Sequence, residues 1–513
     1  MASVLALVFL TLFAALAVAF ATSAHMGLHT TRNYKDAVVA EMAAESGLAY
    51  AMHALSDCES EPTLQELPDM LDVIQAHLAA KIPGSAVCQT QMTLDGNSTV
   101  RCVTVSPQTL PSGDTFTIKV YVCDVDANQT PTKLQMVVTG QAGGLTRRVG
   151  IRFDVDVDKT LLHYSVSSTS RIIARGNVRM HGPISTSYGR FPEEGVRNNS
   201  IYPLDIRLGW EGRIDGTIGT TDSKADFTGD PSLGDDDFHD GISSENPSMN
   251  LLAKMVYNQP HAMDLDVDDF DTSPLKARTS TANLPPADYD GRKWYGWGDD
   301  GSGKPPLENI CVPKGTNPHF KKCRFKGITY IDVNEETTDP TPSNQNKVIF
   351  EDCTFEGPII TGVPRKMNWK HNKMEFRGKT VFRTSMIQET LGGVTLMAPN
   401  YNVNIGGCEN GGGEGNSDVC GLIVGGCVDL YNDITVRGTV VSMAKLINDG
   451  QPIMNMPLSW LASSGVCGAN VGNLDGSSQN IDIWPDPSNV IPLGIKKRYR
   501  VFRVKDSYEE YPN

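Results

Sequence analysis

The hydrophobic pattern of the chain begins with an unbroken apolar segment. Residues 2–24 carry no charged side chain, and the first lysine or arginine is Arg32. About 20 helical residues cross the ~30 Å hydrocarbon core of a bilayer, so this segment is long enough to span it. The alternative is a cleaved secretory signal, which has a basic region ahead of an apolar run of about 7–15 residues. The pattern favours a retained single-pass membrane helix, with the large acidic remainder of the chain exported.

A helical pattern continues after the apolar segment, up to about residue 57. Small residues recur there at spacings of three and four: Ala40, Ala44, Gly47, Ala51 and Ala54. Such spacing places them on one side of a helix, where a stripe of small side chains lets another backbone approach closely. We therefore predict one long helix over residues 1–57, with this stripe as its helix-packing face. The approaching backbone belongs either to another subunit or to the chain's own domain.

Residues 58–158 combine a short helical pattern with alternating, strand-like segments. The helical pattern covers 63–82, and the alternating segments are 100–105, 115–125, 134–139 and 146–157. Consecutive alternating segments with turn residues between them predict an antiparallel meander. Cys58, Cys88, Cys102 and Cys123 lie in this region, and the sequence does not choose among their three possible pairings.

From about residue 159 onward, short strand-like runs recur with glycine in similar places. The clearest examples are Phe325-Lys326-Gly327, Phe355-Glu356-Gly357, Phe376-Arg377-Gly378 and Val436-Arg437-Gly438. A repeat of about 20 residues with insertions indicates stacked coils, so we predict a right-handed parallel β-helix-like domain over 159–462. A β-sandwich is the alternative. We expect a long polar insertion at about 223–320 and a C-terminal capping segment over 463–513. The predicted fold class is mixed α and β, mainly β.

Two cysteines occupy the same place in this repeat. Cys323 stands two residues before Phe325, and Cys353 stands two residues before Phe355. Equivalent positions in adjacent coils lie one strand spacing apart, about 4.8 Å, and disulfides need Cα separations of about 4.4–6.8 Å. We expect the two residues to stack, either as a disulfide or as a ladder of buried thiols.

Charge and motifs narrow the functional classes. The chain has 45 basic and 60 acidic residues, a net charge of -15, which argues against nucleic acid as a partner. It contains no G-x-S-x-G, H-E-x-x-H or Walker A motif. The acidic runs at 235–237 and 264–271 are interpreted as solvated loops, and the aromatic group at 294–297 as a loop anchor or a sugar-stacking platform. We predict no catalytic, metal-binding or cofactor-binding residue, no cofactor, and a protein that is not an enzyme.

The N-terminal region resembles a known family. The apolar segment running into Ala43, Ala44, Glu45, Ser46, Gly47, Leu48 and Ala51 is similar to the start of type IV pilin-like proteins, especially PilX-type minor pilins and large pseudopilins. The resemblance covers about the first 60 residues. It departs from the family at two points: no basic leader ending in Gly precedes the apolar run, and Leu5 stands where most pilins have Glu.

The resemblance implies an inner-membrane protein that assembles with other pilin-like subunits through its N-terminal helix. The expected function is that of a minor pilin-like or pseudopilin-like subunit, displaying a β-helical head on a type IV pilus or a type II secretion filament. The alternative is a membrane-anchored surface protein, either a carbohydrate-active β-helix enzyme or an adhesin. In both cases a surface ligand such as a polysaccharide is a possible partner.

Overall fold

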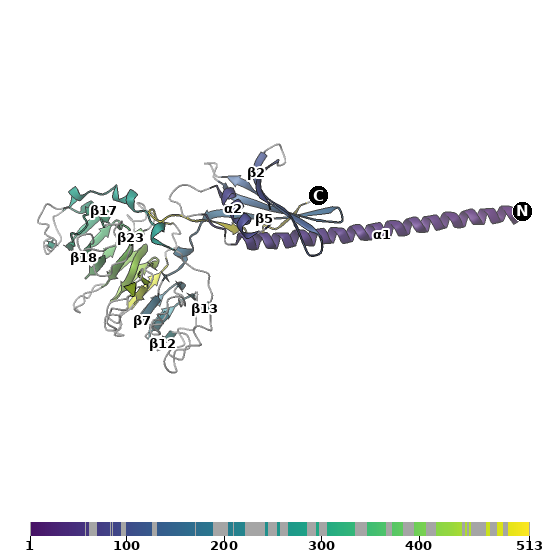
Figure 1. Cartoon of the computed structure of the whole chain (residues 1–513). Helices are drawn as coiled ribbons and strands as arrows, with labels where there is room; N and C mark the ends of the chain where they lie inside the picture. Colours follow the sequence, from purple (N-terminus) through teal and green to yellow (C-terminus); the bar gives the residue numbers. More distant parts are fainter. Residues whose placement is uncertain are drawn as a thin grey trace. The chain divides into compact units, whose positions relative to one another are not determined.

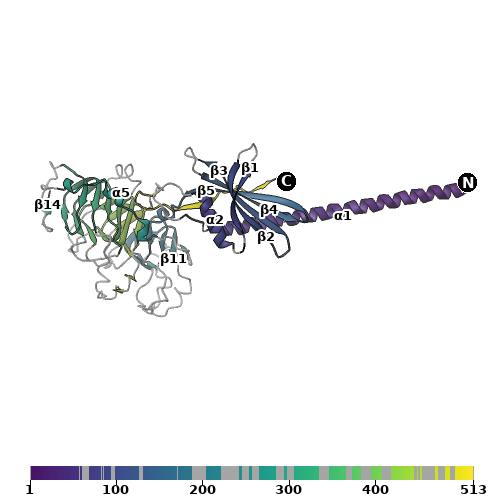
Figure 2. The ribbon, with the colours of Figure 1, turned by 45° about the horizontal axis from the view of Figure 1, so that its top comes forward.

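The computed structural model contains two compact units, which Figures 1 and 2 show in two orientations. One unit comprises Met1–Asp158 with Arg498–Asn513, and the other comprises Lys159–Lys497. The structure describes residues 2–511 apart from the following: 57, 61–68, 83, 85, 94–98, 126–130, 170, 188–203, 209, 221–241, 245–253, 257–264, 285–293, 297–304, 334–345, 366–371, 383–393, 407–416, 444–446, 449–450, 453–467, 472–479 and 486–490.

The first unit is a long helix and a short helix on an antiparallel sheet. Its elements are α1 (Ala2–Leu55), α2 (Met70–Lys81), β1 (Val87–Thr93), β2 (Thr99–Thr109), β3 (Thr115–Val125), β4 (Pro131–Ala142), β5 (Leu145–Val157), β32 (Tyr499–Arg503) and β33 (Glu509–Tyr511). The strand order is β1-β2-β3-β4-β5-β32, and β33 also pairs with β5. The predicted meander is therefore extended by β1 on one side and by the C-terminus of the chain on the other.

The core of this unit follows from the two sequence periods. Alternate residues of β2, β3 and β4, such as Val103, Ile118 and Met136, are fully buried. They pack in one cluster with the residues of α1 that recur every three or four positions, including Ala44 and Ala51. A period of two on the strands and a period near 3.6 on the helix thus bring two apolar faces together.

The second unit consists mainly of short parallel strands. These are β6 (Val166–Ser168), β7 (Arg171–Met180), β8 (Ile184–Thr186), β9 (Leu204–Leu208), β10 (Arg213–Ile214), β11 (Thr217–Thr220), β12 (Ile242–Ser244), β13 (Lys254–Val256), β14 (Trp294–Gly296), β15 (Leu307–Val312), β16 (His319–Lys321), β17 (Arg324–Ile331), β18 (Lys347–Glu351), β19 (Thr354–Glu356), β20 (Ile359–Thr361), β21 (Lys373–Arg377), β22 (Val381–Phe382), β23 (Val394–Ile405), β24 (Ser417–Cys420), β25 (Leu422–Leu430), β26 (Ile434–Arg437), β27 (Val440–Ser442), β30 (Gly468–Val471) and β31 (Asn480–Trp484).

The remaining described elements of this unit are short. They are η1 (Thr160–His163), η2 (Val267–Asp269), α5 (Ser273–Lys276), η3 (Thr281–Asn283), β28 (Ile447–Asn448) and β29 (Gln451–Pro452). Strands β28 and β29 form an antiparallel pair of their own.

The parallel strands pair coil upon coil, as expected for a β-helix-like domain. On one side of the coils β16 pairs with β18 and β18 with β21. On the second side β17 pairs with β19 and β19 with β22. On the third side the second half of β17 pairs with β20, and β20 pairs with β23. Each coil thus contributes strands to three stacks.

The order of the coils in space is not their order in the chain. Strands β30 and β31, near the end of the unit, pair with β7 near its beginning, and β27 pairs with β6. From β7 the stack continues through β9 to β12. The chain therefore enters and leaves this domain at adjacent coils in the middle of the stack.

This order corrects two predicted domain boundaries. Residues 463–513 are not one capping segment, because β30 and β31 belong to the coils whereas β32 and β33 complete the sheet of the first unit. Residues 223–320 are not a simple insertion, because β12 to β16 lie within them and pair as coil strands. Four of these strands, β12, β13, β14 and β16, have only three residues each, too few to show an alternating pattern in the sequence.

Identical side chains stack inside the coils. Phe320, Phe350 and Phe376 form one stack with ring centroids 5.5 and 5.2 Å apart. Phe325, Phe355 and Phe382 form a second stack with both spacings at 4.8 Å. Phe376 is therefore not equivalent to Phe325 and Phe355, as its Phe-x-Gly sequence suggested, but belongs one strand earlier in the coil.

Candidate functional site

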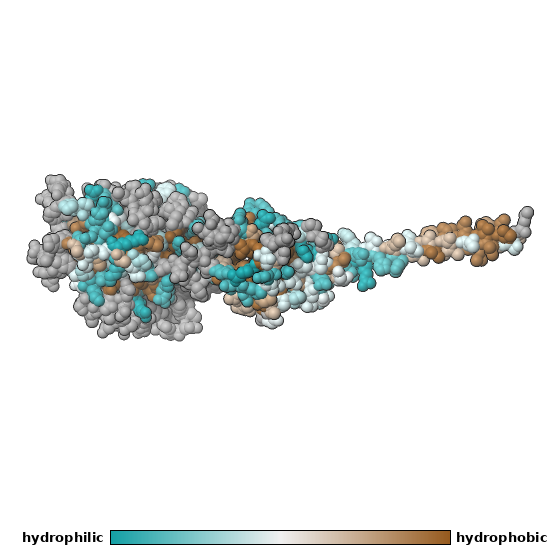
Figure 3. Space-filling view, turned by 90° about the horizontal axis from the view of Figure 1, so that it is seen from above, coloured by the Kyte–Doolittle hydropathy of each residue, from teal (hydrophilic) through white to brown (hydrophobic). Residues whose placement is uncertain are grey.

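The N-terminal part of α1 is apolar and entirely exposed within the chain. Leu5, Phe9, Phe13 and Phe20, for example, are between 55% and 71% exposed. Figure 3 shows this part of the helix as a nearly continuous hydrophobic surface. By length and composition α1 qualifies as a membrane span, and it is the one such helix in the part of the chain that the structure describes. The chain thus has a single-pass anchor candidate at its N-terminus.

The stripe of small residues on α1 packs against the sheet of its own unit. Ala40, Ala44 and Ala51 are fully buried, Gly47 is buried and Ala54 is 7% exposed. A Cβ atom added at Gly140 of β4 would lie 2.0 Å from the carbonyl oxygen of Ala40 and 2.5 Å from the nitrogen of Ala44.

The close approach that small residues permit is therefore used inside the unit. A Cβ added at Gly47 would lie 2.6 Å from the ring of Phe116 and 2.8 Å from the side chain of Val138. We assign the five residues of the stripe to intramolecular packing, and a contact between subunits through α1 needs another face of the helix.

The opposite face of α1 is exposed and partly apolar. Tyr34, Val38 and Met42 follow each other at four-residue spacing and are 72%, 37% and 60% exposed. Val38 and Met42 each lie two positions from Ala40, which is about 200° around the helix at 100° per residue. We call Tyr34, Val38 and Met42 the outward stripe. It continues the apolar character of the membrane segment along the part of α1 that carries the sheet.

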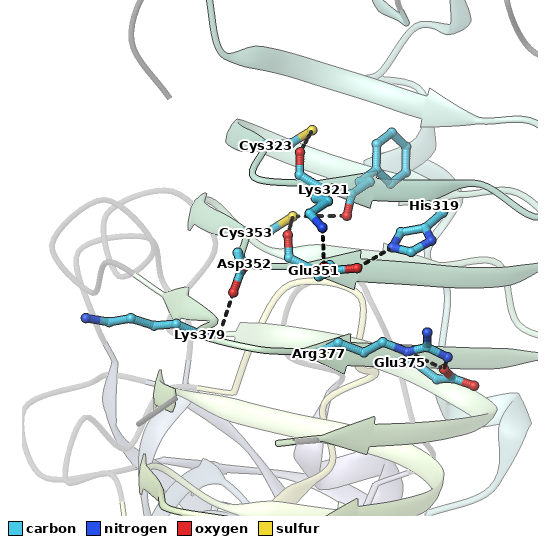
Figure 4. A network of polar contacts seen from close by, with 10 residues as sticks. His319, Lys321, Cys323, Glu351, Asp352, Cys353, Glu375, Arg377 and Lys379 are labelled. Atoms are coloured by element: carbon cyan, nitrogen blue, oxygen red, sulfur yellow. Dashed lines mark hydrogen bonds and ion pairs between the residues drawn. The ribbon is translucent and has the colours of Figure 1, made fainter. Parts of the chain in front are cut away.

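Cys323 and Cys353 occupy equivalent places in adjacent coils. The residues that follow them, Arg324 and Thr354, are partners in the parallel register of β17 and β19. The cysteines are 2% and 1% exposed, and both are thiols in this structure. Burial raises the pKa of Cys353, and its hydrogen bond with Cys323 raises it further. Figure 4 shows the two sulfur atoms on neighbouring coils.

A ladder of charged side chains covers the outer surface of β16, β18 and β21. In Figure 4, Glu351 of β18 contacts Lys321 and His319 of the preceding coil. The Lys321 Nζ atom lies 2.7 Å from one carboxylate oxygen of Glu351, and His319 Nε2 lies 3.0 Å from the other. Burial lowers the pKa of His319 and outweighs the opposing effect of Glu351. These contacts tie adjacent coils together across the outer surface.

Glu375 of β21 is the most enclosed carboxylate of this ladder. Its side chain is only 8% exposed, yet Lys373 Nζ lies 2.8 Å and Lys347 Nζ 3.3 Å from one of its oxygens. Arg377 contacts the other oxygen, with Nε at 2.9 Å. Burial alone would raise the pKa of Glu375, but Lys373, Lys347 and Arg377 together lower it to about 2. Glu375 is therefore a structural anion at neutral pH.

The remaining sequence candidates have structural roles where the structure describes them. Asp266 and Asp269 form the capping box of η2, and Asp271 accepts hydrogen bonds from the backbone and hydroxyl of Ser273 at the start of α5. Trp294 and Tyr295 pair through their backbones with His319 and Phe320. Residues 235–237, Asp264 and Trp297 lie outside the described residues. Within the described part, no three His, Cys, Asp or Glu side chains form a group that could hold a metal ion.

Comparison with known proteins gives a likeness in structure but none in sequence. No protein-family model matches the chain, and no curated protein matches its sequence. Among solved structures, the chain is similar to the competence-associated pilin ComZ from Thermus thermophilus. The sequence identity is 12% and the TM-score is 0.30, with 92% of this chain and 97% of that chain covered. A likeness at this TM-score carries no functional inference.

Proposed function

We propose that this protein is a structural assembly subunit, minor pilin-like or pseudopilin-like, that displays a β-helical head on a type IV pilus or a type II secretion filament. One observation carries the proposal. A single 54-residue helix is exposed and apolar in its N-terminal part and is packed against an antiparallel sheet in its C-terminal part. In this proposal the protein has no catalytic activity.

The exposed segment of α1 needs an apolar environment. At roughly 25 cal/mol per Å², burying its Leu, Val and Phe side chains is worth about 1.5–3 kcal/mol for each residue. Both a bilayer and a bundle of similar helices supply such an environment. In this proposal the subunit is first a single-pass protein of the inner membrane with the rest of its chain exported. It then assembles into the filament with other pilin-like subunits, where their helices surround its apolar segment.

A continuous helix suits this role mechanically. At 1.5 Å per residue, 54 residues span about 81 Å. The C-terminal part of α1 packs tightly against Gly140 and Phe116, so the helix and the sheet belong to one compact unit. When the apolar segment of α1 is inserted into a filament, the sheet of the first unit is therefore brought to the filament with it.

The charged ladder supports a structural rather than a catalytic role. A general acid or base works best with a pKa near the operating pH. The pKa values of Glu375 and Glu351 are both lowered by neighbouring cations, so these carboxylates stay ionised and paired at neutral pH. Their contacts with Lys373 and Lys321 stabilise the coils instead.

The experiment that tests the proposal probes two positions on the exposed face of α1. A photo-crosslinking amino acid placed at Val38, on the outward stripe, is expected to form adducts with other filament subunits in cells. The same probe at Ala49, which is exposed on α1 between the packed positions Leu48 and Ala51, maps how far the contact surface extends. A probe at Gln91, exposed on β1 at the edge of the sheet opposite β32, is the matched negative control.

The outcomes separate the alternatives. Adducts from Val38 that contain other subunits, with none from Gln91, support assembly through the helix. A protein that stays in the membrane and yields no subunit adduct from Val38 contradicts the assembly role while leaving the anchor intact.

A further inference from the structure

An exposed tryptophan and a polar network lie on the outer surface of the second unit. They lie where β31, near the end of this unit's chain, pairs with β7, near its beginning. The backbone N–H of His181 donates to the carbonyl oxygen of Ile483 at 2.8 Å, and that of Asp215 donates to Met180 at 2.7 Å. Because β31, β7 and β10 are parallel and in register, Trp484, His181 and Asp215 form a column across three coils. The folding order of the coils creates this surface from segments about 300 residues apart in the chain.

Trp484 is held in a fixed orientation by His181. The two rings are stacked, with centroids 3.4 Å apart and an interplanar angle of 10°. Trp484 nevertheless remains 48% exposed. Because His181 covers one face of the indole, the exposed surface lies on the opposite face and the rim. A large aromatic side chain that is both immobilised and open to solvent is a ready platform for stacking.

Polar side chains surround this platform, and each acidic one lies near a basic side chain or an imidazole. His181 Nδ1 lies 3.3 Å from Asp215, and His181 Nε2 lies 3.6 Å from Asp482. Arg213 pairs with Asp215, while Arg179 pairs with a further carboxylate, Glu211, and lies 3.8 Å from Asp482. Each carboxylate thus has a cationic or imidazole neighbour, and each side chain of the network is partly exposed.

A second exposed tryptophan lies just before β10, in the coil that carries Asp215. Trp210 is 64% exposed and directly precedes Glu211. The backbone N–H of Glu211 donates to Asn177 Oδ1 at 3.2 Å, which holds this turn against β7. The polar network is therefore flanked by Trp484 at the end of one coil and by Trp210 at the start of another.

We infer that this surface, made of Trp484, His181, Asp215, Asp482, Arg179 and Glu211, binds a neutral saccharide chain. The C–H face of a pyranose is apolar and stacks on the negative face of an indole ring. Its hydroxyl groups both donate and accept, so they suit alternating carboxylates and guanidinium groups. A nucleic acid or a polyanionic glycan needs an excess of cations, which this network does not offer. The two tryptophans suit a chain of several sugars rather than a monosaccharide.

The test is a binding measurement on the full chain. The protein is kept in a zwitterionic detergent without a sugar head group, so that the detergent does not compete for the site. Isothermal titration calorimetry is performed with hexasaccharides of glucose, mannose, galactose and N-acetylglucosamine, and with a hexamer of galacturonate as the acidic contrast. At least one neutral hexasaccharide is expected to bind, with a Kd below about 1 mM, and to bind more tightly than the acidic hexamer.

Variants locate the site. Trp484→Ala is expected to weaken binding about tenfold or more, which corresponds to about 1.4 kcal/mol. Trp484→Phe keeps an aromatic face and is expected to retain most of the affinity. Phe502→Ala removes an aromatic side chain of similar exposure, 40%, from the first unit and is expected to change nothing.

Three results overturn the inference: no neutral hexasaccharide binds, the galacturonate hexamer binds more tightly, or Trp484→Ala binds as well as the unmodified protein. If Trp484→Ala alters the circular dichroism spectrum, Trp210→Ala replaces it, with the same expected direction and a smaller loss. The inference concerns the parallel domain alone, so its failure leaves the assembly role untouched, and failure of the assembly role leaves it standing.

Discussion

The two units of the chain build a hydrophobic core in different ways. In the first unit, one helix with small side chains lies on an antiparallel sheet, and the fit depends on backbone contact at Gly140. In the second unit, the same kind of side chain repeats from coil to coil, as in the two stacks of phenylalanine rings. The first core is therefore most sensitive to added atoms, and the second to removed ones.

The sharpest test of this contrast is removal of a ring from the second core. Phe350→Ala deletes a fully buried ring that stacks on Phe320 and Phe376. We expect a loss of about 3–5 kcal/mol in the free energy of unfolding of the second unit, the usual cost of such a cavity. Calorimetry of the full chain measures it, with the exposed Phe502→Ala as control. A loss below about 1 kcal/mol would show that the stacks are not the core.

Addition of one methyl group tests the first core. Gly140→Ala places a Cβ atom 2.0 Å from the carbonyl oxygen of Ala40, which a backbone atom cannot avoid by changing rotamer. We expect the first unit to lose about 3 kcal/mol or more, at the upper end of overpacking effects, while the second unit unfolds as before. Gly27→Ala adds the same methyl group inside α1, where no atom lies within 4 Å, and is expected to be neutral to slightly stabilising because Ala favours a helix over Gly.

The ion pairs on the outer surface predict a pH dependence of the second unit. The pKa of Glu375 in the folded protein is lowered to about 2, so its contribution is complete above its ordinary value of 4.5 and disappears as the pH falls toward 2. Glu375→Gln is expected to cost at most about 3 kcal/mol at pH 7 and close to nothing at pH 2. Denaturant titrations at both pH values measure this. Glu308→Gln, at an exposed ion pair with Lys326, is the control.

The smallest expected effect concerns the stacked cysteines. Cys323→Ser replaces a buried thiol by a more strongly hydrated hydroxyl, at an expected cost of about 1–2 kcal/mol. Cys88→Ser, at an exposed position, is expected to be neutral. Peptide mass mapping of the exported protein with and without reductant shows whether Cys323 and Cys353 are two thiols or one disulfide. A loss well above this range, together with a linked peptide that joins Cys323 to Cys353 and separates on reduction, would show that a bridge replaces the thiols.

The sequence predicts the fold class because its signals are local. The apolar segment of α1, the alternation along β2 to β5 and the Phe-x-Gly runs each lie within a few consecutive residues. The register of Cys323 and Cys353 also follows from a short repeat. Each of these features is visible without knowing which segments meet in space.

These local patterns could not predict which distant strands pair with one another. Nothing in β30 or β31 indicates that they pair with β7, and strands of three residues, such as β12 and β14, show no period. The phase of Phe376 was wrong for a related reason. Gly378 and Gly327 both have positive φ, 65° and 66°, so two different turns of the coil produce the same Phe-x-Gly sequence.

The candidate functional residues could be predicted only where their signal is local in the sequence. The membrane segment needed only composition, whereas the role of the small-residue stripe depended on which backbone covers it. The column of Trp484, His181 and Asp215 has no signal in the sequence, because three coils distant in the chain form it. An isolated Trp near the end of a strand-like run is the only local hint.

The central claim is that α1 carries this protein into a filament. Mass spectrometry of filaments sheared from the producing cells, compared with their membrane fraction, tests it directly. We predict that the chain is present in both fractions, and that Phe13→Asp, which places a charge in the exposed apolar segment, removes it from the filaments. A chain that is absent from sheared filaments, although abundant in the membrane, would contradict the account.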